Sequence, residues 1–280
     1  MKIKKLITDF LGGKPFYEKL RLIIYKYSVK DRQKKTEQDI LFRANGGLDE
    51  KYLDIKKIKD IHRGERCFIV ATGPSLTIED LEKLKGEITI GINSIVRLYD
   101  QTDWRPTYYG IQDWHVYQAL EDTLKMNIKP DDRVFAAKYL SDKFELPGDV
   151  TLFPFNGDYH LFEGKIGTPN AKFSDDAYIT VYDGYSVTYS MIQLAVYMGF
   201  EKIYLLGCDC SWGKNKKNHI VESGYVDKNA LSNPVKQRVA YKCALDYTKT
   251  HNVKIYNATR GGELEIFERV DLDKVLEGKQ

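Results

Sequence analysis

The sequence predicts a Rossmann-like α/β protein, in which a doubly wound, mainly parallel sheet follows an N-terminal helical extension and carries a lid loop. Two observations support this prediction. From residue 65 onward, continuous apolar runs, which suit strands covered on both faces, alternate with segments whose apolar residues recur at helical spacing. Toward the C-terminus, two successive helix-to-strand units repeat one plan, as expected of parallel crossovers.

Residues 1–62 differ from the rest and are predicted to form a basic helical extension, whereas residues 63–280 form the nucleotide-binding catalytic domain. In the extension, apolar residues recur at helical spacing among many Lys and Arg residues: Phe16, Leu20, Ile23, Ile24 and Tyr27. The pattern predicts an amphipathic helix with a basic face. Such a helix packs on its own domain or on a sister subunit, or it docks on an anionic membrane surface.

The catalytic domain is predicted to begin with a strand at residues 66–72, a Gly-Pro-Ser turn and a helix. Thr77 and Asp80 are spaced as a capping box at the start of that helix. Apolar runs predict four further strands, at residues 87–93, 106–113, 133–138 and 150–155.

A helix over residues 187–198 is expected to stop at Gly199 and to lead into a strand at residues 202–207. A second helix beginning at Pro234 leads into a strand at residues 253–259. The polar segment between these units, residues 211–233, is too long for a simple connection and is predicted to be a lid.

Composition excludes several classes of function. The chain has 43 basic and 40 acidic residues, and its net charge of +3 does not call for nucleic acid as a partner. Four cysteines lie in or beside apolar runs, which predicts reduced thiols and a cytoplasmic location. The first residues lack the apolar length of a signal peptide or membrane span, so any membrane contact is expected to be peripheral.

The Gly-Pro-Ser turn lies where a parallel sheet binds ligands, outside the carboxyl ends of its strands. Gly73 lets backbone approach a ligand closely, Pro74 removes a donor that the helix start does not use, and Ser75 offers a hydroxyl. The turn suits the phosphate or sugar of a nucleotide. A tight turn without a ligand explains the same residues equally well.

Four motifs, which occur in a fixed order and include the turn, carry a resemblance to known families over residues 65–260. They are "FIVATGPSL", "GINSI", an Asp ending the next strand, and "SVTYSMIQLAVYMGFEKIYLLGCDCSW". The chain resembles the bacterial sialyltransferases of glycosyltransferase family 42 and the broad MptE-like family, named after a 6-hydroxymethylpterin pyrophosphokinase. The sialyltransferases carry Asn where this chain has Thr72, and Val187 interrupts their Thr-Ser-Gly helix start.

The resemblance implies a set of site residues. His219, the histidine of the lid, matches the catalytic base. The implied nucleotide-binding residues are Thr72, Gly73, Pro74, Ser75, Asn93, Asp113, Ser186, Thr188 and Asp209. His115 is the competing base, and Lys214, Lys216, Lys217 and Tyr225 are candidates to hold the donor phosphate.

Three functions follow as hypotheses. The preferred one is a glycosyltransferase that uses a nucleotide-activated sugar, a CMP-nonulosonate, with a glycan or lipid-linked acceptor in surface glycan synthesis and no required cofactor. The second is a pyrophosphokinase using ATP and a pterin-like alcohol, in which Asp113 and Asp209 share Mg²⁺. The third is a noncatalytic protein that binds a nucleotide-sugar. The chain is also a candidate homo-oligomer.

Overall fold

The computed structural model describes residues 14–211, 219–226 and 232–278. Its main sheet has eight strands in the order β10-β9-β8-β1-β2-β3-β4-β5, and all neighbours are parallel. The strands are β1 (Arg66–Val70), β2 (Thr89–Ile92), β3 (Tyr108–Ile111), β4 (Arg133–Ala137), β5 (Asp149–Phe153), β8 (Lys202–Leu206), β9 (Lys254–Asn257) and β10 (Glu268–Arg269). The predicted Rossmann-like fold is confirmed.

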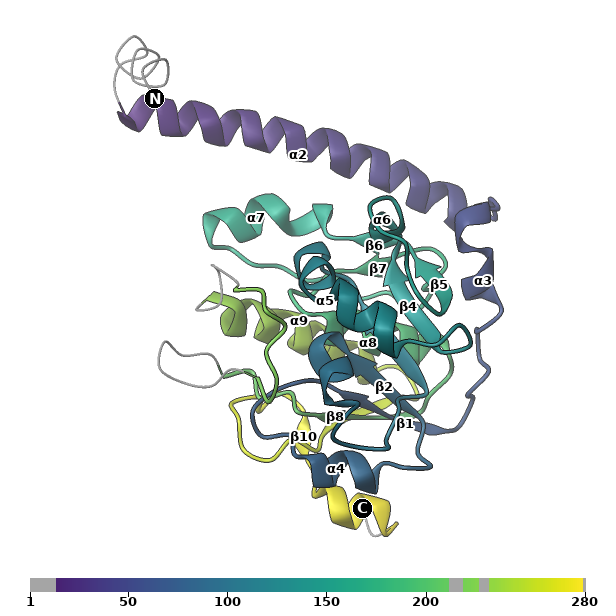
Figure 1. Cartoon of the computed structure of the whole chain (residues 1–280). Helices are drawn as coiled ribbons and strands as arrows, with labels where there is room; N and C mark the ends of the chain where they lie inside the picture. The colour runs from purple at the N-terminus through teal and green to yellow at the C-terminus, as the bar shows by residue number, and fades with distance from the viewer. Residues whose placement is uncertain (1–13, 212–218, 227–231, 279–280) are drawn as a thin grey trace.

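Helices connect and cover the strands (Figure 1). The α-helices are α2 (Lys14–Ala44), α3 (Leu53–Lys56), α4 (Ile78–Lys83), α5 (Trp114–Asn127), α6 (Lys138–Ser141), α7 (Leu161–Ile166), α8 (Val187–Tyr197), α9 (Asn233–Thr248) and α10 (Leu272–Leu276). The 3₁₀ turns are η1 (Glu50–Tyr52), η2 (Asn93–Leu98) and η3 (Asp158–His160). A small parallel pair, β6 (Phe155–Asn156) and β7 (Val181–Tyr182), lies outside the main sheet.

The direction in which strands are added reverses between β1 and β8. Strands β1 to β5 follow one another on one side of β1, whereas β8, β9 and β10 follow on the other side. In an open parallel sheet, such a reversal leaves a crevice at the carboxyl ends of the two strands. Residues 71–75 and 207–210, which leave β1 and β8, therefore meet at this topological switch point.

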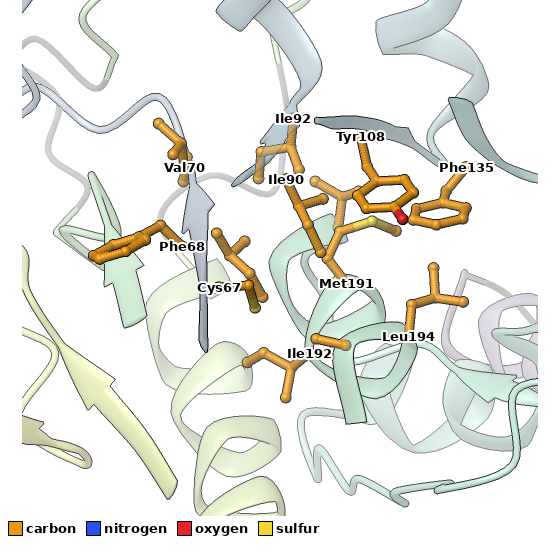
Figure 2. Close-up of a cluster of buried hydrophobic side chains, with 14 of the residues drawn as sticks. Cys67, Phe68, Val70, Ile90, Ile92, Tyr108, Phe135, Met191, Ile192 and Leu194 are labelled. Atoms are coloured by element: carbon orange, nitrogen blue, oxygen red, sulfur yellow. The ribbon is translucent and has the colours of Figure 1, made fainter. Parts of the chain in front are cut away.

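Part of the core lies between the sheet and α8, and α4 and α5 bury further residues of the same core. Met191, Ile192 and Leu194 of α8 point toward β1, β2 and β3 in Figure 2. A side chain at Gly110 in β3 would place its Cβ 3.1 Å from Cγ of Met191, so the missing side chain lets α8 approach the sheet closely. This packing holds the start of α8 beside the carboxyl ends of the strands.

Two predicted helix ends are confirmed. The hydroxyl of Thr77 accepts a hydrogen bond from the amide of Asp80 at 3.2 Å, and Oδ2 of Asp80 accepts one from the amide of Thr77 at 3.0 Å. At the end of α8, Gly199 has a φ of +91° and its amide donates to the carbonyl of Val196. The glycine is required there because other residues rarely adopt this conformation.

The predicted N-terminal helix is present as α2, a long helix along one side of the molecule, over α7 (Figure 1). Its predicted apolar face is not the face that packs. Ile23, Ile24 and Tyr27 are 51%, 60% and 65% exposed. The helix does pack on the chain's own domain, as one of the expected alternatives had it, but through a different face, which contacts η3 and α7.

The segment after α2 joins the sheet domain earlier than residue 63. Tyr52 and Ile55 are buried in the same core as β1.

The four cysteines are free thiols, and Cys67, Cys208 and Cys210 are buried as expected. Across the described ranges, no helix combines the length and apolarity needed to cross a bilayer.

Candidate functional site

The turn after β1 and the segment after β8 are bonded to each other. The hydroxyl of Ser75 donates to Oδ2 of Asp209 at 2.7 Å, and the amide of Ser75 approaches the same oxygen at 3.5 Å. The amide of Gly73 donates to the carbonyl of Gly207 at 2.8 Å, which extends the pairing of β1 with β8 beyond both strands. Three of the predicted residues thus converge at the switch point.

Gly73 is needed for a reason that the sequence did not indicate. A Cβ at this position would lie only 2.8 Å from Cγ of Asp209, and closer still to its Oδ2 and to the carbonyl of Gly207. The space that we expected a ligand to use beside this glycine is therefore filled by the Asp209 carboxylate. Pro74 next to it is exposed.

The first described lid residues cross the end of β1. Nδ1 of His219 is bonded to the hydroxyl of Thr72 at 3.0 Å, and the amide of Ile220 donates to the carbonyl of Thr72 at 2.8 Å. The hydroxyl of Ser94 in η2 donates to the carbonyl of Val221 at 2.8 Å. The lid histidine is thus held at the predicted turn.

Arg97 extends this attachment, and sequence reasoning missed it. Its guanidinium donates to the carbonyl of Glu222 at 3.0 Å and to that of Ala119 in α5 at 3.2 Å. Nothing in its sequence neighbourhood distinguishes Arg97 from a surface arginine, because both of its partners are backbone carbonyls far away in sequence.

Two buried acceptors lie at the ends of neighbouring strands. Asn93 follows β2 with a φ of +50°, and its carbonyl accepts from the hydroxyl of Tyr109 at 2.6 Å. Within the described part of the chain, neither Oδ1 of Asn93 nor Oε1 of Gln112, after β3, has a hydrogen-bond partner. Buried polar atoms are normally paired, so both oxygens suit donors from a bound molecule. Asn93 was predicted, whereas Gln112 was missed.

Asp113 has a structural role at the start of α5. Its Oδ1 accepts from the amides of His115 and Val116 at 2.7 and 3.0 Å, which caps the helix. Strands are spaced about 4.8 Å apart, and β2 and β1 separate β3 from β8, so Asp113 and Asp209 follow strands about 14 Å apart. Sharing of one cation by these two carboxylates would require both side chains to reach across this spacing, and it stays a prediction.

Ser186 and Thr188 lie where α8 meets α9. The hydroxyl of Ser186 caps α8 by accepting from the amide of Thr188 at 3.2 Å. Thr188 is buried near the Cys208 thiol. Tyr241 lies near both hydroxyls, and burial raises its pKa well above the usual value. Their roles in donor binding stay predictions.

Burial shifts the pKa values of the two central groups in opposite directions. Burial lowers the pKa of His219 below its ordinary value, while Glu222, the Thr72 backbone and Asp209 act against that shift. Burial raises the pKa of Asp209, opposed by its bonds from Ser75. Burial therefore favours the neutral imidazole, the form that accepts a proton.

The other histidines are accounted for by packing. His115 stacks on Tyr225, with ring centroids 4.8 Å apart. His160 is buried, bonded to Asp183 at 3.0 Å and stacked between Tyr159 and Tyr185. Asp183 also accepts from Gln112 at 3.3 Å, which links this cluster to the carboxyl end of β3.

Some predicted features lie elsewhere or outside the described residues. Lys214, Lys216 and Lys217 fall outside the described ranges. In residues 14–211, 219–226 and 232–278, no group of three His, Cys, Asp or Glu side chains is placed to hold a metal ion. A cavity of about 250 Å³ lies between α2 and the β6–β7 segment, lined by Gln33, Glu37, Ile40, Leu41, Asn156, Tyr159, Lys172 and Tyr182.

Two solved structures align with most of the chain. The MAf glycosyltransferase from Magnetospirillum magneticum AMB-1 is 16% identical, with a TM-score of 0.50; the alignment covers 82% of this chain and 40% of that one. A mammalian sialyltransferase, solved with Gal-beta-1-3GalNAc-ortho-nitrophenol, is 9% identical, with a TM-score of 0.38 and coverages of 82% and 79%. The chain thus spans less than half of the MAf enzyme, and these similarities concern the fold alone.

A comparison with curated proteins finds no match. The model of the family described as 6-hydroxymethylpterin diphosphokinase MptE-like matches residues 48–215, more than half of the chain. The match includes β1, β8 and both segments that meet at the switch point. The chain therefore belongs to the MptE-like family.

Proposed function

We propose that this protein is a glycosyltransferase that takes a sugar from a nucleotide-activated donor, a CMP-nonulosonate, at the switch point between β1 and β8. The observation that carries the proposal is the convergence of Ser75, Asp209 and His219 at that crevice. The fold shared with the MAf glycosyltransferase is consistent with this class of reaction.

The donor would bind through polar groups at the strand ends. The Asp209 carboxylate accepts a hydrogen bond from a ribose hydroxyl, and the turn of residues 72–75 lies beside the phosphate of the donor. The buried oxygens of Asn93 and Gln112 accept hydrogen bonds from the amino group of cytosine or from sugar hydroxyls. The acceptor is a glycan or a lipid-linked glycan, and the product belongs to surface glycan assembly.

The transfer step needs a base and a good leaving group. An acceptor hydroxyl oxygen forms a bond to the anomeric carbon of the nonulosonate, while the bond from that carbon to the CMP phosphate oxygen breaks and its electron pair leaves with CMP. The hydroxyl proton passes to His219. The bond between Nδ1 and Thr72 orients the ring. In the tautomer whose Nδ1–H donates to Thr72, the lone pair lies on Nε2, which takes the proton.

Thermal stabilisation by nucleotides tests the donor. CMP is expected to raise the melting temperature more than UDP or GDP, without Mg²⁺, because a ligand that binds only the folded state stabilises it. Asp209→Asn should reduce the CMP shift, whereas Asp246→Asn, an exposed carboxylate on α9, should leave it unchanged. A turnover assay with CMP-nonulosonate then separates an enzyme from a noncatalytic binding protein.

The family description supports a second candidate, a Mg²⁺-dependent pyrophosphokinase that uses ATP and a pterin-like alcohol. In this case Asp209 would hold the cation together with phosphate oxygens and water. Asp113 follows β3, which β1 and β2 separate from β8, so it would lie farther from the cation. Stabilisation by ATP with Mg²⁺, and by no cytidine nucleotide, would favour this candidate over the first.

A further inference from the structure

Helix α2 uses one face to contact the rest of the chain. Val29 is buried on this face, and the side-chain amide of Gln33 donates to the carbonyl of Asp158 at 2.8 Å. Nearer the end of the helix, the guanidinium of Arg43 donates to the carbonyl of Ile179 at 2.9 Å. These positions recur at helical spacing, so they define the inward face of α2.

The opposite face of the first half of α2 is apolar and uncovered. At about 100° per residue, Ile23, Ile24 and Tyr27 lie between about 120° and 220° around the helix from Val29. All three are more than half exposed. Clustered exposed apolar side chains of this kind mark an interaction surface. We call Ile23, Ile24 and Tyr27 the outer apolar patch.

Basic residues surround the outer apolar patch. Residues 20–35 contain six Lys and Arg residues and one acidic residue. All six are exposed: Arg21, Lys26, Lys30, Arg32, Lys34 and Lys35. Arg32 pairs with Asp158 and Lys26 lies over the Phe162 ring, so these two face the chain's own domain. The acidic residue, Asp31, is on the outer side. Lys30 and Lys34 follow Tyr27 at spacings of three and seven residues, so they continue the same side of the helix. The patch is thus apolar at its centre and cationic around it.

We propose that this face of α2 docks the protein on a membrane surface rich in anionic lipid, with the outer apolar patch inserted among the headgroups. An apolar stripe within a cationic border is what interfacial binding requires. A second copy of the chain is a poorer partner, because pairing of the two outer faces would bring two cationic helices together. The contact is peripheral, since no described helix is long and apolar enough to span a bilayer.

The geometry allows docking without unfolding. The inward face of α2 keeps its contacts with η3 and α7 while the outer face meets lipid. In Figure 1, α2 lies along one side of the molecule, and α10 with the C-terminus lies at the opposite side. The helix can therefore lie in the plane of a membrane with the catalytic domain beneath it.

Sedimentation of the full chain with vesicles tests the proposal. With about one third phosphatidylglycerol in phosphatidylcholine, we expect at least about fivefold more bound protein than with phosphatidylcholine alone, and a loss of this binding at high salt. The double variant Ile23→Gln/Ile24→Gln should lose most of the binding. The matched control, Met126→Gln/Val235→Gln, changes two apolar residues on α5 and α9 that are at least as exposed, and it should bind as the wild type does.

Two further measurements separate lipid from protein partners and folding defects. Tyr27→Trp should give a blue-shifted emission on the anionic vesicles, and circular dichroism should show that the Ile23/Ile24 variant keeps its helix content. Equal binding to neutral and anionic vesicles, or no binding to either, would overturn the proposal. So would a wild-type dimer in solution that the Ile23/Ile24 variant converts to monomer.

Discussion

The hydroxyl of Ser75 donates to Oδ2 of Asp209 at 2.7 Å, across the boundary at which the strand order reverses. This bond joins residues 134 positions apart and places a buried carboxylate at the mouth of the sheet. Burying a charged carboxylate at this position costs free energy of desolvation. An apolar residue in the same turn would not carry that cost. The position is consistent with the proposed role of Asp209 in ligand binding, which stays a prediction.

Replacing Gly73 by alanine should destabilise the fold. The new Cβ would overlap the Asp209 carboxylate and the Gly207 carbonyl, and the backbone carbonyl cannot rotate away. We expect a loss of about 1–3 kcal/mol in the free energy of unfolding, measured by urea denaturation. Gly157→Ala is the control, since its closest contact would be the ring of Phe155, at 3.1 Å. Equal stability of the two variants would contradict the packing described here.

Asp209→Asn should change the pH dependence of stability. Burial raises the folded-state pKa of Asp209, so its contribution is fully present below the unfolded pKa of about 3.9 and is lost as the pH rises through the folded value. The amide does not ionise. The free energy of unfolding of the variant, relative to wild type, should therefore increase between pH 4 and pH 7. A pH-independent difference would show that the carboxylate is not desolvated.

His219→Gln should reduce turnover by about a hundredfold or more while leaving CMP binding intact. In the wild type, burial lowers the pKa of His219, so kcat/KM should fall only below about pH 6.5, as the imidazole becomes protonated. His251→Gln, in an exposed histidine after α9, is the control. Unchanged turnover in the His219 variant would exclude it as the base.

Arg260→Ala should destabilise the protein although Arg260 is half exposed. Its guanidinium pairs with Asp80, a buried carboxylate that also caps α4. Removing the arginine leaves that charge without its cation, at an expected cost of about 1–2 kcal/mol after allowance for solvent at the arginine. Arg63→Ala, in an exposed pair with Asp60, should cost almost nothing. Thermal unfolding of the two variants checks the difference.

Much of the fold could be predicted because local patterns determine it. The seven longer strands of the main sheet coincide with the apolar runs, and the Thr77–Asp80 capping box and the stop at Gly199 depend on neighbouring residues. The packing of α2 could not be predicted in this way. Its most apolar face faces outward, because polar contacts from Gln33 and Arg43 fix the helix orientation.

The residues of the candidate site were predicted where they follow strands or where the family resemblance names them. Ser75, Asn93 and Asp209 come after apolar runs, and His219 was implied by the resemblance. Ser94, Arg97 and Gln112 were missed, since their roles arise from tertiary contacts with the lid or from buried atoms that pattern analysis does not see. The order of strands, which sequence patterns do not fix, separates Asp113 from Asp209, so their sharing of a cation stays a prediction.

A crystal structure of the protein soaked with CMP tests the nucleotide site most directly. We predict CMP in the crevice between β1 and β8, with its ribose on Asp209 and its phosphate beside residues 72–75. Two results would contradict the account. CMP could bind only in the cavity between α2 and the β6–β7 segment, or the crevice between β1 and β8 could bind ATP with Mg²⁺ and never CMP.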